Sequence, residues 1–335
     1  MKSDLIARLL RDRSRTPQTS VIQAFAPANI ALIKYWGKRD NELNLPRTDS
    51  LSVSLAERGS LTKISTHSCK DIISLNGQIV NPESDFAKRL ISFIDLFRVE
   101  EKVYFKIDTK NTIPTAAGLA SSASGFAALV KALNQLYAWD CTEKELSILA
   151  RIGSGSACRS LYSGFVYWQA GKDKHGLDSF SYRLDVTWPE LRIGLLTISA
   201  EQKEISSRVA MNRTTGSSIL YQQWPAQVEN DMKKIKIALE EKDFIMMASI
   251  AENNALAMHA TMISSWPPIL YWHPQSIAAM QKIWRLREQG LQLYFTMDAG
   301  PNLKLLFLKN EQQSVISEFP DIKIISPFTT NTRQL

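Results

Sequence analysis

Alternation of apolar and polar residues is the clearest local pattern in the first half of the chain. A half-buried strand shows this period of two, because successive side chains point to opposite faces of a sheet. Residues 21–35 show it on both sides of P-A-N, which predicts a strand, a turn and a second strand. Similar short segments predict further strands over residues 51–55, 62–66, 72–75, 103–107 and 164–168.

Helical spacing of apolar residues follows these strands. Residues 86–97 place large apolar side chains three and four positions apart, which indicates an amphipathic helix. Other helices are expected over residues 126–137, 143–152, 219–239, 244–258 and 276–289. Strands at 191–199, 291–297 and 322–325 complete the second half, and the segment between the last two is left open between a helix and an edge strand.

The order of these elements predicts an α+β protein with two domains. We place the boundary near Trp188-Pro189, which gives a first domain over residues 21–189 and a second over 190–330. Residues 1–20 form an N-terminal extension, expected to be an appendage with one short amphipathic helix and a Pro-Thr-Ser linker. Asp4 and Asp12 argue against a transit peptide, and no long apolar run indicates a secretion signal.

Composition and charge restrict the class of protein. The chain has 335 residues, 44% hydrophobic and 22% charged, as in ordinary soluble globular proteins, with no apolar run long enough for a membrane helix. Its three cysteines are far apart, so a reducing, cytoplasmic location is expected and neither a disulfide framework nor a zinc site is implied. The net charge of +7 suits phosphorylated metabolites or nucleic acid. Because the basic residues are dispersed, small phosphorylated ligands are favoured.

The segment 111–125, N-T-I-P-T-A-A-G-L-A-S-S-A-S-G, lies between a predicted strand and a predicted helix. Free N–H groups and the positive end of a helix bind anions there, and Gly118 allows the backbone to approach a phosphate. The segment is neither a Walker loop nor a dinucleotide-binding loop. A tightly packed helix start is the alternative interpretation.

Three other polar segments interrupt apolar surroundings: residues 34–44, 153–159 and 298–302. Any one of them alone is explained by capping of a strand or helix. Four such segments in one chain, each rich in Gly, Ser, Lys, Arg or Asp, favour one shared site.

The amino-acid sequences of these segments resemble the motifs of a known family. The order Pro114-x-x-x-Gly118-Leu119-Ala120-Ser121-Ser122 is similar to the ATP-phosphate loop of the superfamily that contains galactokinase, homoserine kinase and mevalonate kinase. Within that superfamily, four stretches resemble the diphosphomevalonate decarboxylase family: A-P-A-N-I-A-L-I-K-Y-W-G-K (26–38), G-S-G-S-A-C-R-S (153–160), M-H-A-T (258–261) and M-D-A-G-P-N (297–302).

The resemblance implies a fold and a reaction. The fold would be a two-domain GHMP-kinase-like α+β fold, with a ribosomal-S5-domain-2-like first domain, a ferredoxin-like second domain and the active site in the cleft between them. The reaction would convert mevalonate 5-diphosphate and ATP, with Mg²⁺, into isopentenyl diphosphate, ADP, phosphate and CO₂, a step of isoprenoid biosynthesis in the mevalonate pathway. A homodimer is also implied, with no nucleic-acid or membrane partner.

The resemblance also implies residue roles. Asp298 would orient or deprotonate the substrate alcohol, Arg159 would bind the substrate carboxylate, and Lys38 would neutralise charge near the phosphoryl group or substrate. The other substrate-binding candidates are Lys34, Tyr35, Ser154, Ser156, Lys203, Ser207 and Arg208. For each of these, a capping or solvated turn residue is the alternative interpretation.

The ATP-binding candidates are Pro114, Ala117, Gly118, Leu119, Ala120, Ser121 and Ser122, with Ser121 as the candidate magnesium ligand. One departure from the family concerns P-x-N-x-S, which stands here as Pro46-Arg47-Thr48-Asp49-Ser50. Thr48 replaces the usual Asn, and Asp49 is expected to add negative charge near the site. A related decarboxylase or kinase acting on mevalonate monophosphate or mevalonate is therefore the alternative, and an RNA-binding module is the alternative from another class.

Overall fold

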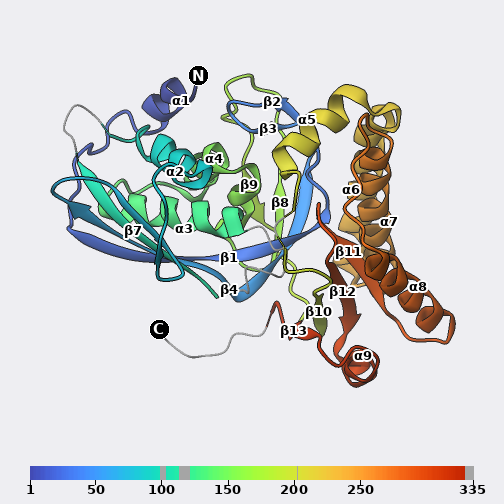
Figure 1. Ribbon diagram of the computed structural model, residues 1–335. Helices are drawn as coiled ribbons and strands as arrows, with labels where there is room; N and C mark the ends of the chain where they lie inside the picture. Colours follow the sequence, from blue (N-terminus) through green and yellow to red (C-terminus); the bar gives the residue numbers. More distant parts are fainter. Residues whose placement is uncertain (99–102, 113–120, 202, 329–335) are drawn as a thin grey trace.

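The computed structural model describes residues 1–98, 103–112, 121–201 and 203–328. Two sheets with their own helices lie side by side, which confirms the predicted two-domain α+β organisation (Figure 1). In the described part of the chain, the first sheet has seven strands in the order β6-β5-β7-β4-β8-β9, and β1 pairs with β4. Its strands are β1 (Val21–Ile33), β4 (Ser50–His67), β5 (Ile72–Leu75), β6 (Gln78–Ile79), β7 (Tyr104–Asn111), β8 (Phe165–Trp168) and β9 (Ser181–Arg183).

The two longest strands correct the sequence prediction. Residues 21–33 form one strand rather than two, and β4 unites the strands expected at 51–55 and 62–66. The two strands pair antiparallel from Val21↔Ser65 to Ile33↔Leu51, with a register shift between Pro27 and Asn29. Pro lacks the N–H that a ladder needs, so it disrupts pairing locally while the strand continues through a bulge. The turn signal in P-A-N therefore marks a bend.

Helices of the first domain pack on one face of this sheet. They are α2 (Asp85–Ile94), α3 (Ser121–Leu136), α4 (Glu143–Gly153) and the 3₁₀ helix η2 (Gly155–Leu161). Helix α3 lies across β1 and β4 and also contacts α4 and η2. Thr142 and Glu145 form a capping box that fixes the start of α4. The short hairpin β2 (Lys38–Asp40) and β3 (Leu45–Pro46) leaves β1 toward the second domain.

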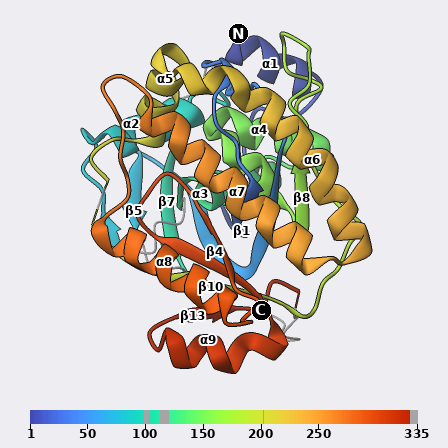
Figure 2. The ribbon, with the colours of Figure 1, turned by 90° about the vertical axis from the view of Figure 1, so that its right-hand side faces the viewer.

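The second domain has a four-stranded sheet in the order β11-β12-β10-β13. Its strands are β10 (Leu191–Leu196), β11 (Tyr294–Met297), β12 (Leu303–Leu308) and β13 (Lys323–Ile325). Long helices stand beside it, as Figure 2 shows. The helices are α5 (Ser207–Ser217), η3 (Ile219–Gln223), α6 (Trp224–Glu241), α7 (Phe244–Ile263), α8 (Pro274–Glu288), η4 (Lys309–Glu311) and α9 (Gln312–Glu318). No helix in the described ranges is both long and apolar enough to cross a bilayer.

One hydrophobic core joins the two domains. Helix α7 contacts both β11 and β1, and residues of β1, β4 and β8 share a buried cluster with residues of α6 and α7. The backbone carbonyl of Trp36 accepts hydrogen bonds from the Tyr221 hydroxyl at 3.1 Å and the Trp224 indole at 3.0 Å. Gly37 has φ +102° and lies against Tyr221, so a side chain at this position has no space. The end of β1 is therefore fixed at the domain junction.

The N-terminal segment is packed rather than appended. The predicted helix is present as α1 (Lys2–Leu9), and Leu5, Ile6 and Leu10 are buried in the core of the first domain. Arg13 binds the Glu145 carboxylate at 2.9 Å. The interpretation of this segment as an appendage is thus wrong, because its apolar residues pack into the core of the first domain. A local sequence pattern does not reveal which surface such residues contact.

This packing predicts that Leu10→Ala destabilises the protein. The side chain is fully buried, and removing such a leucine typically costs about 2–5 kcal/mol through lost burial and a residual cavity. Urea unfolding measures the change. The neighbouring exposed Arg11→Ala should change stability by less than about 0.5 kcal/mol. Equal, small effects of both substitutions would show that the segment is not part of the core.

Candidate active site

Asp298 is held between two buried lysines at the domain junction. It follows β11, Lys34 follows the last residue of β1, and Lys304 lies in β12. Lys34 Nζ lies 3.1 Å from Asp298 Oδ1, and Lys304 Nζ lies 3.3 Å from Asp298 Oδ2. Both lysine side chains are 2% exposed, whereas the Asp298 side chain is 32% exposed. The carboxylate is therefore the one member of this trio that a ligand can reach.

Charges and burial set the protonation of this trio. Burial disfavours ionisation of Asp298, but Lys34 and Lys304 outweigh it and hold the pKa of the carboxyl well below its usual range. Burial lowers the pKa of Lys34 to about 8, while Asp298 opposes this decrease. At neutral pH Asp298 is therefore a carboxylate, and Lys34 is mostly an ammonium group.

Further hydrogen bonds fix the orientation of the trio. Lys34 Nζ donates to the Ala31 carbonyl at 2.7 Å, and its backbone N–H donates to Asn254 Oδ1 at 2.8 Å. His259 Nε2 lies 3.1 Å from the backbone carbonyl of Asp298. Burial lowers the pKa of His259 to about 3, so its ring is neutral, and Nε2 must carry the hydrogen that the carbonyl accepts.

Arg159, Tyr35 and Trp168 form a second group of contacts. The Arg159 guanidinium donates to Ser50 Oγ and to Asn29 Oδ1, and it lies over the Trp168 ring with 5.7 Å from Cζ to the ring centre. The Tyr35 ring packs against the same indole at 4.7 Å. The Tyr35 hydroxyl is buried and has no hydrogen-bond partner among the described residues. A buried hydroxyl without a partner is uncommon, and a bound ligand would satisfy it.

The segment 153–159 is shaped for this approach of Tyr35. A Cβ atom at Gly155 would lie 2.7 Å from the Tyr35 hydroxyl oxygen, so only glycine leaves room for the ring. Ser154 caps the C-terminus of α4, and Ser156 follows in η2, where the chain turns toward Arg159. The small residues of this segment therefore serve close packing around Tyr35 as well as any contact with a ligand.

Lys38 belongs to a cationic cluster, defined as Lys2, Lys38, Arg89 and Arg208. Lys38 Nζ donates to Asn44 Oδ1 at 2.7 Å, and Arg89 donates to the Gly153 carbonyl at 2.7 Å. Burial, followed by the positive charges of Arg208, Arg89 and Lys2, lowers the pKa of Lys38 to about 8. Such mutual repulsion favours the binding of an anion.

Lys203 connects the segment before α5 to the Asp298 segment. Its ammonium group donates to Ser207 Oγ at 2.8 Å and to the Ala299 carbonyl at 3.0 Å. Arg208 follows Ser207 in the first turn of α5 and is exposed. The sequence candidates of the second domain therefore face the same junction as those of the first.

The described parts of the four polar segments thus meet. Asn44 donates to the carbonyls of Arg151 and Ile152 at 2.9 and 3.0 Å, which joins residues 34–44 to the end of α4. Lys34 joins the first segment to Asp298. Helix α3 packs against η2, and its residue Ser124 shares a hydrogen bond with Ser60 at 2.7 Å.

Comparisons with known proteins agree with this arrangement. Residues 26–181 match the model of the diphosphomevalonate decarboxylase-like N-terminal domain, and residues 193–333 match that of the mevalonate 5-diphosphate decarboxylase C-terminal domain. The chain belongs to the diphosphomevalonate decarboxylase family. It is 39% identical to diphosphomevalonate decarboxylase mvd1 of Aspergillus fumigatus, over 87% of this chain and 77% of that protein.

Solved structures of diphosphomevalonate decarboxylases have the same fold. The mevalonate diphosphate decarboxylase from Staphylococcus aureus superposes with a TM-score of 0.87 at 36% identity, covering 93% of this chain and 96% of that one. A structure of MDDEF in complex with MVAPP, AMPPCP and magnesium gives a TM-score of 0.84 at 37% identity, covering 92% and 98%. The predicted GHMP-kinase-like, two-domain fold of the family is therefore confirmed.

The ATP loop falls largely outside the described residues. Pro114, Ala117, Gly118, Leu119 and Ala120 lie there, so their predicted roles stay predictions. Ser121 begins α3, and Ser122 follows it in the first turn. Helix α3 therefore begins at 121 rather than at the predicted 126, inside the segment that was expected to be a loop, and it packs against η2.

The departure from the family motif has two different outcomes. The Asp49 carboxylate accepts hydrogen bonds from the Tyr167 hydroxyl and from the Ala170 backbone N–H, the latter at 2.7 Å. It therefore holds the end of β8, and the expectation that Asp49 adds negative charge near the site stays a prediction. The Thr48 hydroxyl is buried without a hydrogen-bond partner in the described part of the chain, so Thr48 stays a candidate for an effect on substrate preference.

Sequence reasoning missed several residues of this site. They are Lys304, His259, Arg89, Lys2 and Asn29. Lys304 had a recognisable signal, since a single lysine in the apolar strand L-K-L-L-F-L must find a buried partner. Arg89 and Lys2 had none, because each lies in an amphipathic helix where a cation is ordinary.

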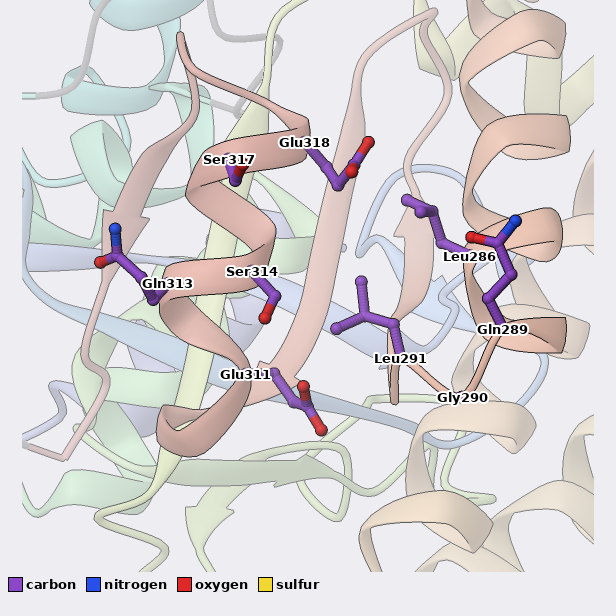
Figure 3. A pocket seen from close by; sticks show the side chains of 9 residues that line it. All are labelled: Leu286, Gln289, Gly290, Leu291, Glu311, Gln313, Ser314, Ser317 and Glu318. Atoms are coloured by element: carbon purple, nitrogen blue, oxygen red, sulfur yellow. The ribbon is translucent and has the colours of Figure 1, made fainter.

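A surface hollow elsewhere is not this site. It lies between the end of α8 and α9, and its lining includes Glu311 and Glu318 but no lysine or arginine (Figure 3). No residue of the four polar segments lines it. A hollow with carboxylates and no cations is unsuited to a phosphorylated ligand.

The buried His259 predicts a pH dependence of stability. Its ordinary pKa of 6.5 falls to about 3 in the folded protein, so the unfolded chain binds more protons between these values and stability falls as the pH drops through 6.5. His259→Gln keeps a donor for the Asp298 carbonyl and removes this titration. The advantage of wild type over this variant should shrink by about 2 kcal/mol from pH 7 to pH 5 in urea unfolding. A constant difference would contradict the buried, neutral state of His259.

Proposed function

We propose that this chain catalyses the ATP-dependent decarboxylation of mevalonate 5-diphosphate to isopentenyl diphosphate, releasing ADP, phosphate and CO₂. The observation that carries this proposal is the accessible Asp298 carboxylate between two buried ammonium groups, surrounded by cations from both domains. The substrate has a tertiary alcohol, a carboxylate and a diphosphate. The site has chemically complementary groups for all three.

The alcohol is the group on which Asp298 acts. A tertiary hydroxide is a poor leaving group, so the alcohol is first phosphorylated by ATP. The ionised Asp298 accepts the hydrogen bond of the hydroxyl and directs its oxygen toward the γ-phosphoryl group. As the new P–O bond forms and the bond to ADP breaks, the hydroxyl proton passes to the Asp298 carboxylate. Phosphate then leaves with the C–O bonding electrons, positive charge develops at that carbon, and the electrons of the C–CO₂ bond form the alkene as CO₂ departs.

The cations bind the two anionic ends of the substrate. Arg159 takes the carboxylate through its planar guanidinium, beside the Tyr35 hydroxyl, which has no hydrogen-bond partner among the described residues. Ser154 and Ser156 contribute polar contacts on the same side. The cationic cluster, with Lys203 and Ser207, takes the diphosphate. Lys34 keeps Asp298 charged and orients it.

ATP and magnesium are proposed at the start of α3. The ATP phosphates would contact Pro114, Ala117, Gly118, Leu119, Ala120 and the hydroxyls of Ser121 and Ser122. In the described ranges, no group of three or more His, Cys, Asp or Glu side chains is arranged to hold a metal. Mg²⁺ usually binds substrate phosphates with few protein ligands. Ser121 is the proposed ligand, and the ion supplies neutralisation of phosphate charge.

Cytoplasmic location and homodimerisation are further proposals that rest on the family resemblance. Structures of relatives contain substrate and nucleotide analogues, as in MDDEF with MVAPP and AMPPCP. Small-molecule partners are therefore proposed for this chain, without nucleic acid or membrane. A salt-sensitive RNA gel shift would contradict the absence of a nucleic-acid partner.

Product stoichiometry tests the reaction. With ATP, Mg²⁺ and mevalonate 5-diphosphate, the protein should release ADP and CO₂ in equal amounts, and Asp298→Asn should lower kcat by about 10²-fold or more because a neutral amide cannot accept the proton. Mevalonate monophosphate and mevalonate serve as comparison substrates. ADP without CO₂ would identify a kinase, and no ADP from any of the three would refute the proposed substrate class.

The cationic cluster predicts phosphate selectivity. Arg208→Met should raise KM for mevalonate 5-diphosphate by about 10- to 100-fold, since a charge-assisted hydrogen bond contributes roughly 1.5–3 kcal/mol. KM for the monophosphate should rise less. Arg285→Met removes an exposed charge from α8 and is the matched control, expected to leave both values unchanged. Equal increases for both substrates would place Arg208 away from the terminal phosphate.

A further inference from the structure

Lys304 is a buried cation of the second domain that contacts Asp298. It lies in β12, beside Leu303 and Leu305, which are fully or almost fully buried. Its ammonium group lies 3.3 Å from Asp298 Oδ2 and donates to the Asn302 carbonyl at 3.4 Å. Such a buried ammonium is costly unless it is paired, so its position in an apolar strand requires Asp298.

The two lysines contact different oxygens of the Asp298 carboxylate. Lys34 binds Oδ1, while Lys304 binds Oδ2, so the carboxylate is fixed at both oxygens. Lys304 is 2% exposed, and a ligand that reaches Asp298 does not reach the lysine behind it. Any influence of Lys304 on a reaction therefore passes through the carboxylate.

We propose that Lys304 is a positioning residue, which acts through Asp298 by fixing Oδ2 and keeping the carboxylate charged while it holds the substrate alcohol. This inference rests on the proposed function for its kinetic consequence. It deepens that function, because the family motif around Asp298 explains the acid but not the lysine six positions later.

Four cations and one neutral histidine, each from a different part of the fold, lie around Asp298. Lys34 comes from the end of β1, Lys304 from β12, Lys203 from the segment before α5, Arg159 from η2 and the neutral His259 from α7. Among the described residues, Lys34 and Lys304 are the cations that bind the carboxylate oxygens directly. Removing Lys304 therefore leaves one direct cation, and the pKa of the Asp298 carboxyl should rise because burial then weighs more heavily.

The test combines kinetics with a direct titration of Asp298. Lys304→Met should lower kcat by roughly tenfold or more with KM for mevalonate 5-diphosphate within about twofold of wild type, since the lysine does not contact substrate. Lys304→Arg keeps the charge and should recover most of this loss. Lys309→Met removes an exposed charge one residue after β12 and is the matched control, expected to behave as wild type.

Carbon-13 NMR of labelled aspartate carboxyls measures the titration of Asp298 directly. If Lys304 only stabilised the fold, its substitution would leave this titration unchanged. The Asp298 signal, assigned with Asp298→Asn, should titrate at a higher pH in Lys304→Met than in wild type or Lys304→Arg. If the methionine variant does not fold, Lys304→Gln replaces it. A lower melting temperature with an unchanged titration and an unchanged kcat would overturn the proposal.

The same design separates this proposal from the proposed function. If wild type releases neither ADP nor CO₂ from any of the three substrates, the proposed function fails. The NMR titration then still decides whether Lys304 controls the charge of Asp298, and no shift there would overturn the inference independently.

Discussion

The ion pairs between Asp298 and two buried lysines are the interaction on which the site depends. A carboxylate and two ammonium groups at a domain junction are unfavourable unless they stay together, because each has lost most of its contact with water. Their mutual attraction therefore requires the end of β1 and the strands β11 and β12 to meet in one geometry. The shared hydrophobic core and the bonds to the Trp36 carbonyl hold the same junction. Catalytic chemistry and domain arrangement are thus coupled through the trio of Asp298, Lys34 and Lys304.

The cations around this trio differ in what they contact. Lys34 and Lys304 are enclosed and serve the carboxylate, whereas Lys203 and Arg208 are exposed and available to a ligand. Arg159 is buried but braced by Asn29, Ser50 and Trp168, so its planar group is oriented before a ligand arrives. Such preorganisation reduces the cost of ordering side chains when substrate binds. The lowered pKa of Lys38 fits a site that is electrostatically completed by a bound anion.

Much of this arrangement was readable from the sequence, and the exceptions have physical reasons. Periodicity predicted the helices α2, α4, α7 and α8 closely, because each buries one face or lies within the core. It failed for β1 and β4, where Pro27 and the residues opposite it bend a strand that a local reading divides in two. The motif residues from Lys34 to Asp298 were identified from the sequence as site candidates, but the contacts between their side chains were not predicted. Arg89 and Lys2 were missed because the other members of the cationic cluster are distant in sequence, and a local pattern carries no information on such contacts. Lys304 was missed although a single lysine in the apolar strand β12 indicated a buried partner.

A crystal structure with mevalonate 5-diphosphate bound would test the central claim most directly. The substrate alcohol is expected within about 2.6–3.2 Å of the Asp298 carboxylate. The substrate carboxylate is expected on Arg159, and the diphosphate on Lys38 and Arg208. An alcohol directed away from Asp298, or a diphosphate bound on Arg159 instead of the cationic cluster, would contradict the assignment of the site.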